Sequence, residues 1–148
     1  MSFGMHYATQ AYSNIGVETS VPGADPHQLI LMLFEGAQLA IGNAKRHMAD
    51  GEIAAKGTAI SKAIMIIDDG LRASLDVEQG GRIAQNLRSL YEYMSRRLLV
   101  AGAKNDPALL DEVYALLGEL KSAWASIEPA KAAATGSTAA TRTAARSY

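Results

Sequence analysis

Few residues of this sequence have the types and spacing that metal binding or catalysis requires. The three histidines, His6, His27 and His47, lie far apart and near expected helix ends, where a solvated imidazole is the usual outcome. The paired Glu-x-x-His motifs that hold di-iron centres between helices do not occur. We therefore expect no metal ion and no cofactor.

Two pairs of adjacent residues offer further chemistry, and each has a simpler interpretation. Asp68 and Asp69 can share a proton in principle, but neighbouring residues of a helix point about 100° apart, so at least one carboxylate is expected to be solvated. Gly80 and Gly81 lack the glycine pattern and the preceding strand of a phosphate loop. We expect them to form a corner between two helices, with Gly80 in the left-handed conformation. No Ser-His-Asp arrangement is recognisable, and we expect the protein not to be an enzyme.

The composition is typical of a soluble globular domain. The 148 residues are 49% apolar and 20% charged, and the formal net charge of -1 gives no global field to attract nucleic acid or an anionic membrane. Cysteine is absent, which agrees with a reducing compartment. The first residues do not show the basic and apolar regions of a signal peptide, and no stretch reaches about 18 uncharged apolar residues. We expect a cytoplasmic protein with no nucleic-acid partner and no direct membrane insertion.

Apolar residues recur at every third or fourth position through the central part of the chain, which predicts an all-α domain. Asp25 before Pro26, and Asn105 or Asp106 before Pro107, are typical caps and first residues of helices. The expected helices run from residue 25 to near 51, from 53 to about 76–80, from about 81 to 101, and from 107 to 127.

Four amphipathic helices with short connections predict an antiparallel up-down four-helix bundle over residues 25–128. Residues 1–24 are expected to be a Tyr-bearing docking segment, and the Ala/Thr-rich residues 129–148 a disordered tail. The expected core includes Leu33, Ile64, Leu87, Leu90, Leu117 and Trp124.

Apolar and small residues outside the core stripes exceed the needs of a bundle. On the second helix they form a further line, shallow enough for another helix to approach. We assign to a partner-binding groove the residues Tyr7, Tyr12, Ile15, Ala59, Ala63, Ile66, Ile67, Gly70, Tyr93, Leu99 and Val100. The alternative is that a wide core absorbs the helical members. In the free protein the two N-terminal tyrosines can cover the groove.

Four stretches, in this order and spacing, resemble the FliS family of flagellar secretion chaperones: HQLILMLFEGAQLAI, ISKAIMIIDDGLRASLD, GGRIAQNLRSLYEYMSRRL and LLDEVYALLGELKSAWASI. The resemblance covers about residues 5–127. It implies a cytosolic bundle that binds the disordered C-terminal segment of flagellin, prevents premature polymerisation and keeps flagellin competent for the flagellar type III export apparatus. By the same resemblance, Tyr7 and Tyr12 lie over part of the hydrophobic surface, and a weak homodimer is compatible with it.

A second function class stays open at this point. It is a small helical regulator that sequesters another protein, or contacts nucleic acid through Arg82, Arg88, Arg96 and Arg97. Phosphate contacts lose affinity steeply as salt rises, whereas binding in an apolar groove changes little, so salt dependence separates the two classes.

Overall fold

The computed structural model of the chain describes residues 25–127, so the expected docking segment and the expected disordered tail lie outside the described residues. Within this range the elements are α2 (Pro26–Ala49), α3 (Ile53–Met65), the π-helical segment η2 (Ile66–Arg72), α4 (Val77–Lys104) and α5 (Pro107–Ala125). No strand occurs among them, which confirms the all-α prediction.

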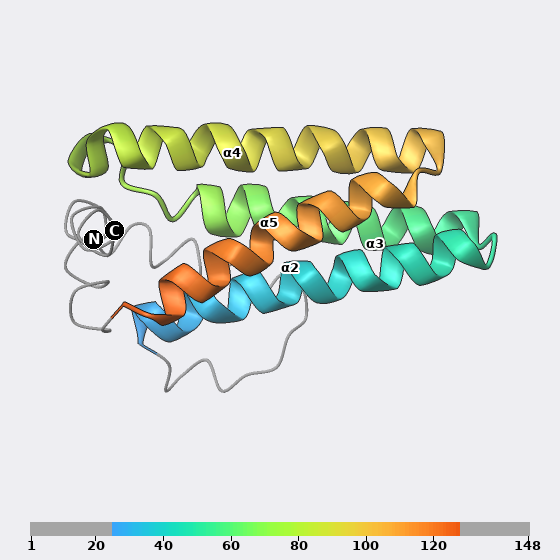
Figure 1. Cartoon of the computed structure of the whole chain (residues 1–148), viewed down its shortest axis with the longest axis horizontal. Coiled ribbons are helices and arrows are strands. Elements are labelled where there is room, and N and C mark those ends of the chain that lie inside the picture. Colours follow the sequence, from blue (N-terminus) through green and yellow to red (C-terminus); the bar gives the residue numbers. More distant parts are fainter. Residues whose placement is uncertain (1–24, 128–148) are drawn as a thin grey trace.

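Successive long helices run antiparallel, as Figure 1 shows. Helix α2 packs against α3 and α5, while α4 packs against η2 and α5, so that α2 and α4 lie diagonally opposite each other. The axis of helix α5 is inclined to that of α4. It starts beside the end of α4 and descends across the bundle to the start of α2 (Figure 1). The predicted antiparallel four-helix bundle is confirmed, with one helix strongly inclined to its neighbour.

The predicted helix starts at Asp25 and Asp106 are confirmed. The Asp25 carboxylate accepts a hydrogen bond from the backbone N–H of Gln28 at 2.8 Å, and Asp106 accepts one from Ala108 at 3.0 Å. Each bond satisfies a backbone donor that a helix leaves without an internal partner. Asn105, the alternative cap, instead ends α4 in the left-handed conformation with φ of 49°.

The glycine pair separates two helical segments, as expected, but it is not the main turn between the second and third helices. Helix α4 begins at Val77, capped by Asp76, and the turn between helices therefore precedes the glycines. Gly81, not Gly80, has a positive φ, with φ 57° and ψ -137°, and it breaks α4 just after its first turn. Only a residue without Cβ adopts these angles without strain, so the glycine pair marks a kink inside the helix.

The second predicted helix is divided, because its last two turns are π-helical. A π turn holds about one residue more than an α turn, since its hydrogen bonds run from i to i+5. This extra residue brings Ile66 and Gly70 inward together with Ile67 and Leu71, and all four are buried. The two lines of apolar residues that the helical period separated therefore merge into one buried face.

The core prediction is partly confirmed. Leu33 and Leu117 are fully buried, whereas four other residues expected in the core pack against its edge and stay partly exposed: Ile64, Leu87, Leu90 and Trp124. On α4 the buried positions include Tyr91, Met94 and Leu98. The buried face of α4 is therefore rotated away from the stripe that the sequence predicted for its first half.

The end of the bundle where α3 begins is fixed by a buried lysine. Lys56 is 8% exposed, and its ammonium donates to the carbonyl of Gly102 at 3.0 Å and to the side-chain oxygen of Asn105 at 2.6 Å. Both acceptors lie at the end of α4, where carbonyls lack intrahelical partners. This contact ties the start of α3 to the connection between α4 and α5.

Candidate functional site

The residues of the predicted groove fall into three groups. Tyr7, Tyr12 and Ile15 lie outside the described residues, so their placement stays a prediction. The five residues from the second helix are buried among the core residues: Ala59, Ala63, Ile66, Ile67 and Gly70. Their small or flat surfaces allow close helix approach, but the bundle itself uses that approach. For these five, the structure agrees with the alternative interpretation of a wide core, and they present no open groove.

The remaining three residues lie on two opposite flanks of α4. Tyr93 bonds to α5, and Val100, seven residues later, shares its face of the helix. Leu99 shares a face with Glu92, whose carboxylate pairs with Arg72 of η2 at 3.6 Å. Leu99 is therefore on the flank toward η2, where it is 61% exposed. Tyr93 and Val100 therefore share one flank of α4, and Leu99 lies on another.

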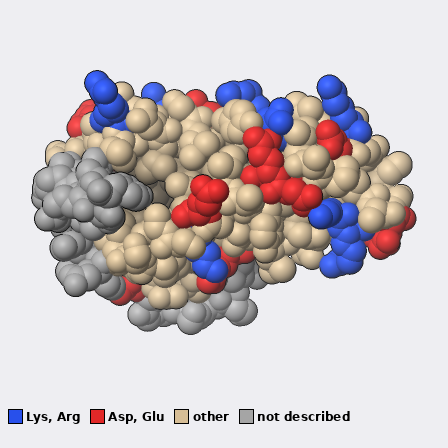
Figure 2. All heavy atoms as spheres, viewed as in Figure 1, with Lys and Arg blue, Asp and Glu red and all other residues tan. Residues whose placement is uncertain are grey.

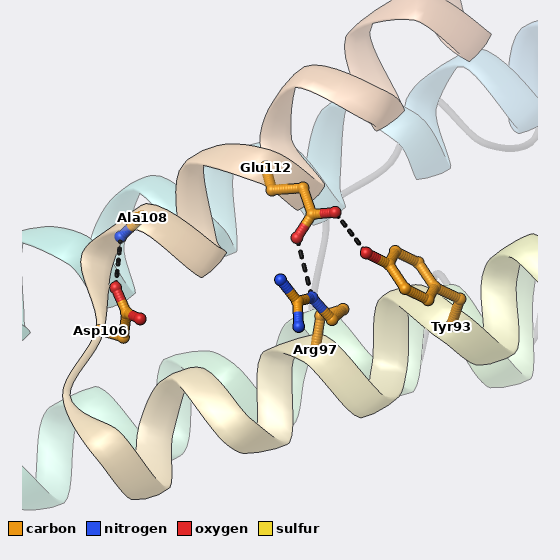
Figure 3. A network of polar contacts seen from close by, with 5 residues as sticks. All are labelled: Tyr93, Arg97, Asp106, Ala108 and Glu112. Carbon is orange, nitrogen blue, oxygen red and sulfur yellow. Dashed lines mark hydrogen bonds and ion pairs between the residues drawn. The ribbon is translucent and has the colours of Figure 1, made fainter.

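A polar network joins α4 to α5 at the point where the two helices meet. Figure 3 shows Tyr93 and Arg97 of α4 reaching toward Glu112 of α5. The Tyr93 hydroxyl donates to one carboxylate oxygen, and Arg97 Nε donates to the other at 2.8 Å. The Arg97 guanidinium carbon also lies 5.6 Å from the centroid of the Tyr93 ring. One carboxylate thus fixes two side chains of the neighbouring helix.

The charges of this network stabilise each other. The hydrogen bond from Tyr93, followed by that from Arg97, holds the pKa of Glu112 below its usual value. The same bond to Glu112 raises the pKa of Tyr93, because a neutral phenol is the donor. Tyr93 therefore keeps its proton and Glu112 its charge at neutral pH, and neither group is set up to transfer a proton.

Ion pairs join α5 to α2 from a point beside the polar network to near the end of the helix. Lys45 of α2 pairs with Asp111 at 2.8 Å, and Glu35 of α2 pairs with Lys121 at 3.3 Å. These two pairs lie nearly three turns apart along α5, and both are about half exposed. The second half of α5 therefore lies along α2, and the first half of α4 is left without α5 at its side (Figure 1).

The divergence leaves apolar side chains partly exposed on the facing flanks of α4 and α5. Leu90 precedes Arg97 by two turns and Leu116 follows Glu112 by one turn, so each continues the flank that carries the polar network. We call this surface the α4–α5 strip and define it as Ile83, Leu87, Leu90, Leu116, Leu120 and Trp124, all of them partly exposed. Figure 2 shows acidic groups near the point where α4 and α5 meet.

The end of the strip is held by a contact that sequence reasoning missed. His27 was expected to be solvated, but it is 6% exposed and its ring stacks on that of Trp124 with centroids 5.4 Å apart. His27 Nε2 lies 2.8 Å from the carbonyl oxygen of Trp124, and the indole N–H donates to the carbonyl of His27 at 3.0 Å. The two residues are 97 positions apart, so no local sequence signal predicts the pair.

The described residues offer no other chemistry. Among residues 25–127, no group of three or more His, Asp or Glu side chains is placed to hold a metal ion. Asp69 is exposed, while Asp68 accepts a hydrogen bond from Ser95 at 2.8 Å, so the two carboxylates are not a proton-sharing pair. In the same range, no helix has both the length and the hydropathy needed to span a lipid bilayer. What the arrangement offers is a partly exposed apolar surface with a fixed polar boundary.

Comparison with known proteins assigns a family to this bundle. The family model described as flagellar protein FliS matches residues 8–131. The chain is 51% identical over 120 residues to a flagellar secretion chaperone FliS of Salmonella typhimurium, covering 81% of this chain and 89% of that protein.

Two further relatives carry the same description. The Escherichia coli protein is 47% identical over 116 residues, covering 78% of this chain and 85% of its own length. The protein FliSB of Pseudomonas aeruginosa is 47% identical over 120 residues, covering 81% and 94%. Each is named as a flagellar secretion chaperone and none as an enzyme. The matched range includes every helix described above, and the chain belongs to the FliS family of flagellar secretion chaperones.

Proposed function

We propose that the protein is a cytosolic chaperone that binds the disordered C-terminal segment of flagellin. The bound segment is unavailable for polymerisation and is held in a form that the flagellar type III export apparatus accepts. Membership of the FliS family supports a role in flagellar export. The observation that carries the binding proposal is the α4–α5 strip, where six large apolar side chains remain partly exposed and all but Ile83 pack against the core.

The strip fits an amphipathic segment that becomes helical when it binds. Such a segment presents apolar side chains at positions i, i+3, i+4 and i+7, which match the one-turn and two-turn spacing of Ile83, Leu87 and Leu90 on α4. A disordered partner loses conformational entropy on folding, and burial of apolar surface on both sides offsets that cost. A bundle with an incomplete helix-helix contact offers such surface without unfolding.

Several residues of the predicted groove keep a role in this proposal. Tyr93 and Val100 lie beside the strip on the flank toward α5 and extend it past the polar network. Tyr7, Tyr12 and Ile15 are proposed to cover apolar surface in the free protein. Ala59 and the other buried residues of α3 and η2 support the site from within the core and do not touch the partner.

A charge placed in the strip tests the proposal. Leu87→Glu puts a carboxylate into the apolar contact, and it is expected to weaken binding of a flagellin C-terminal peptide at least tenfold, because the charge has no partner there. Leu39→Glu is the matched control, since Leu39 is 67% exposed on α2 and lies outside the strip. Isothermal titration calorimetry gives both affinities, and circular dichroism verifies that both variants keep the helical content of the parent protein.

The same titration at two salt concentrations separates the proposed function from nucleic-acid binding. We expect the affinity to change less than about threefold between 50 and 200 mM salt, whereas six to ten phosphate contacts would lower it by about 10³–10⁵. Equal affinities of Leu87→Glu and Leu39→Glu for the peptide would show that the partner binds elsewhere.

A further inference from the structure

We propose that Trp124 is the main contact of the α4–α5 strip for its partner, and that His27 is a positioning residue that holds the indole ring ready for it. The inference deepens the proposed function and rests on it. It assigns a role to Trp124, which sequence analysis placed in the core, and to His27, which sequence analysis placed in solvent.

The pair is a closed arrangement of one stacking contact and two hydrogen bonds. The ring planes of His27 and Trp124 are inclined by 15°, so one face of the indole is covered by the imidazole. A carbonyl oxygen can only accept, so the bond from His27 Nε2 to the Trp124 carbonyl requires a proton on Nε2. The indole N–H is used in the return bond to the His27 carbonyl. Both torsions of the tryptophan side chain are therefore fixed.

The partner meets only the apolar part of this ring. With the N–H bonded and one face stacked, the exposed part of the indole consists of carbon atoms, which suits an aliphatic or aromatic side chain of the partner. The imidazole itself is 6% exposed and cannot make this contact. His27 therefore acts on binding only through the position of Trp124.

The position of the pair explains why tryptophan is useful there. It lies at the end of α5, where α5 is bonded to the start of α2 and is farthest from α4 (Figure 1). Tryptophan is the residue most enriched among strong binding contacts. Holding the ring in one rotamer before binding removes an ordering cost that a loose ring would add to the dissociation constant.

The test uses the fact that Trp124 is the sole tryptophan of the chain. Its fluorescence reports on the strip directly, while calorimetry measures the affinity for the flagellin C-terminal peptide independently. In the parent protein, saturating peptide is expected to shift the Trp124 emission to shorter wavelength, because the exposed edge of the ring leaves water. A purely structural role of the pair would leave this emission unchanged by the peptide.

Three substitutions separate the two parts of the contact. His27→Ala removes the stacked ring and the hydrogen bond to the Trp124 carbonyl. It is expected to weaken peptide binding about three- to tenfold, because the Trp124 side chain must then be ordered when the peptide binds. His27→Gln keeps a side-chain donor, His27→Phe keeps the stacked ring, and each should recover part of the loss. His47→Ala is the matched control, because His47 lies on the same helix and bonds to Glu52.

The outcomes are distinct for the inference and for the proposed function. No binding heat with the parent protein refutes the proposed function and the inference together. Binding heat without any change in Trp124 emission refutes the inference alone, as does an unchanged affinity of a folded His27→Ala protein. An equal loss in His47→Ala also overturns it, since the effect would then not come from the pair.

Discussion

The same truncation at two leucines of α4 should have opposite effects on stability and on binding. Leu98 is 0% exposed, whereas Leu90, just over two turns earlier, is partly exposed in the α4–α5 strip. Sequence periodicity places both residues in the core and predicts the same large loss of stability at each. The structure predicts that only Leu98→Ala has that loss, and that only Leu90→Ala affects the partner.

The expected magnitudes follow from burial. Leu98→Ala removes a fully packed side chain and leaves a cavity, which lowers the free energy of unfolding by about 3–5 kcal/mol. Leu90→Ala removes a side chain that water already reaches, so the loss is about 1–2 kcal/mol. In the parent protein, the bound partner buries the part of the Leu90 side chain that is still exposed. In Leu90→Ala these atoms are absent, so this burial is lost. This missing burial is worth about 1 kcal/mol, or about a fivefold rise in the dissociation constant.

Urea denaturation followed by circular dichroism gives the two stabilities, and calorimetry with the flagellin C-terminal peptide gives the two affinities. The titrations are made in buffer without urea, at a temperature well below the melting transitions of both variants, so that each variant is folded. If Leu90→Ala is destabilised as much as Leu98→Ala and binds the peptide normally, the first half of α4 is ordinary core and the strip is not the binding surface.

Three further predictions concern stability alone. Lys56→Met leaves the carbonyl at the end of α4 without its donor and should lower the free energy of unfolding by about 1.5–3 kcal/mol, measured by urea denaturation. The pKa of Glu112 is lower in the folded than in the unfolded protein, so its carboxylate stabilises the fold at pH values above the unfolded-state pKa. This contribution is lost as the pH falls through the folded-state pKa. The melting temperatures of Glu112→Gln and of the parent protein should therefore converge as the pH is lowered through this range. Gly81→Ala should cost about 1–3 kcal/mol through backbone strain, whereas Gly42→Ala, inside α2 with open space around the added Cβ, should gain about 0.5–1 kcal/mol; thermal melts of the two variants test the contrast.

Local signals predicted the helices well, because caps and prolines act within one turn of the residues they affect. Asp25 and Asp106 bond to backbone N–H groups two or three residues away, and Gly51 has a positive φ of 71° where the first helix was expected to end. Family membership was also carried by contiguous stretches of sequence. Most of the predictions that needed only neighbouring residues are confirmed, the exception being the left-handed conformation expected at Gly80, which Gly81 adopts instead.

The π-helical segment could not be predicted, because a count at a period of 3.6 assumes one register along the whole helix. Adjacent Ile66 and Ile67 cannot both be central to one face of an α-helix, and the prediction placed them on different lines. In η2 both are 0% exposed. The second line is also buried where the helix is an ordinary α-helix, at Ala59 and Ala63 of α3, so the predicted groove on the second helix was absorbed by a wide core, with the π-helical turns contributing only at Ile66 and Gly70.

The position of α5 decided the candidate site, and it depends on contacts between residues far apart in the chain. Glu112 joins α5 to α4 early in the helix, and Trp124, twelve residues later, joins it to α2. These two points are about 18 Å apart along α5. A nearly straight helix that is fixed to α4 at the first point and to α2 at the second must diverge from α4 along this length. Neither contact has a signal in local sequence, and sequence analysis assigned Trp124 to the core and no role to Glu112.

The disagreement between pattern and burial is itself informative about function. The strip residues follow the core stripe in sequence, yet the bundle leaves them partly exposed, and a monomer gains nothing from keeping large aliphatic side chains in contact with water. If α5 were inclined only because bulky side chains require space, its end would not have to be fixed by the stacked and hydrogen-bonded Trp124. The polar network joins α5 to α4 at one end of the strip, and the His27–Trp124 pair joins α5 to α2 at the other, so the end of α5 is fixed to α2 and not to α4. Such a fixed, incomplete helix contact is what a partner helix can complete, and this is why the residues that sequence analysis assigned to the core are the ones we expect the partner to cover.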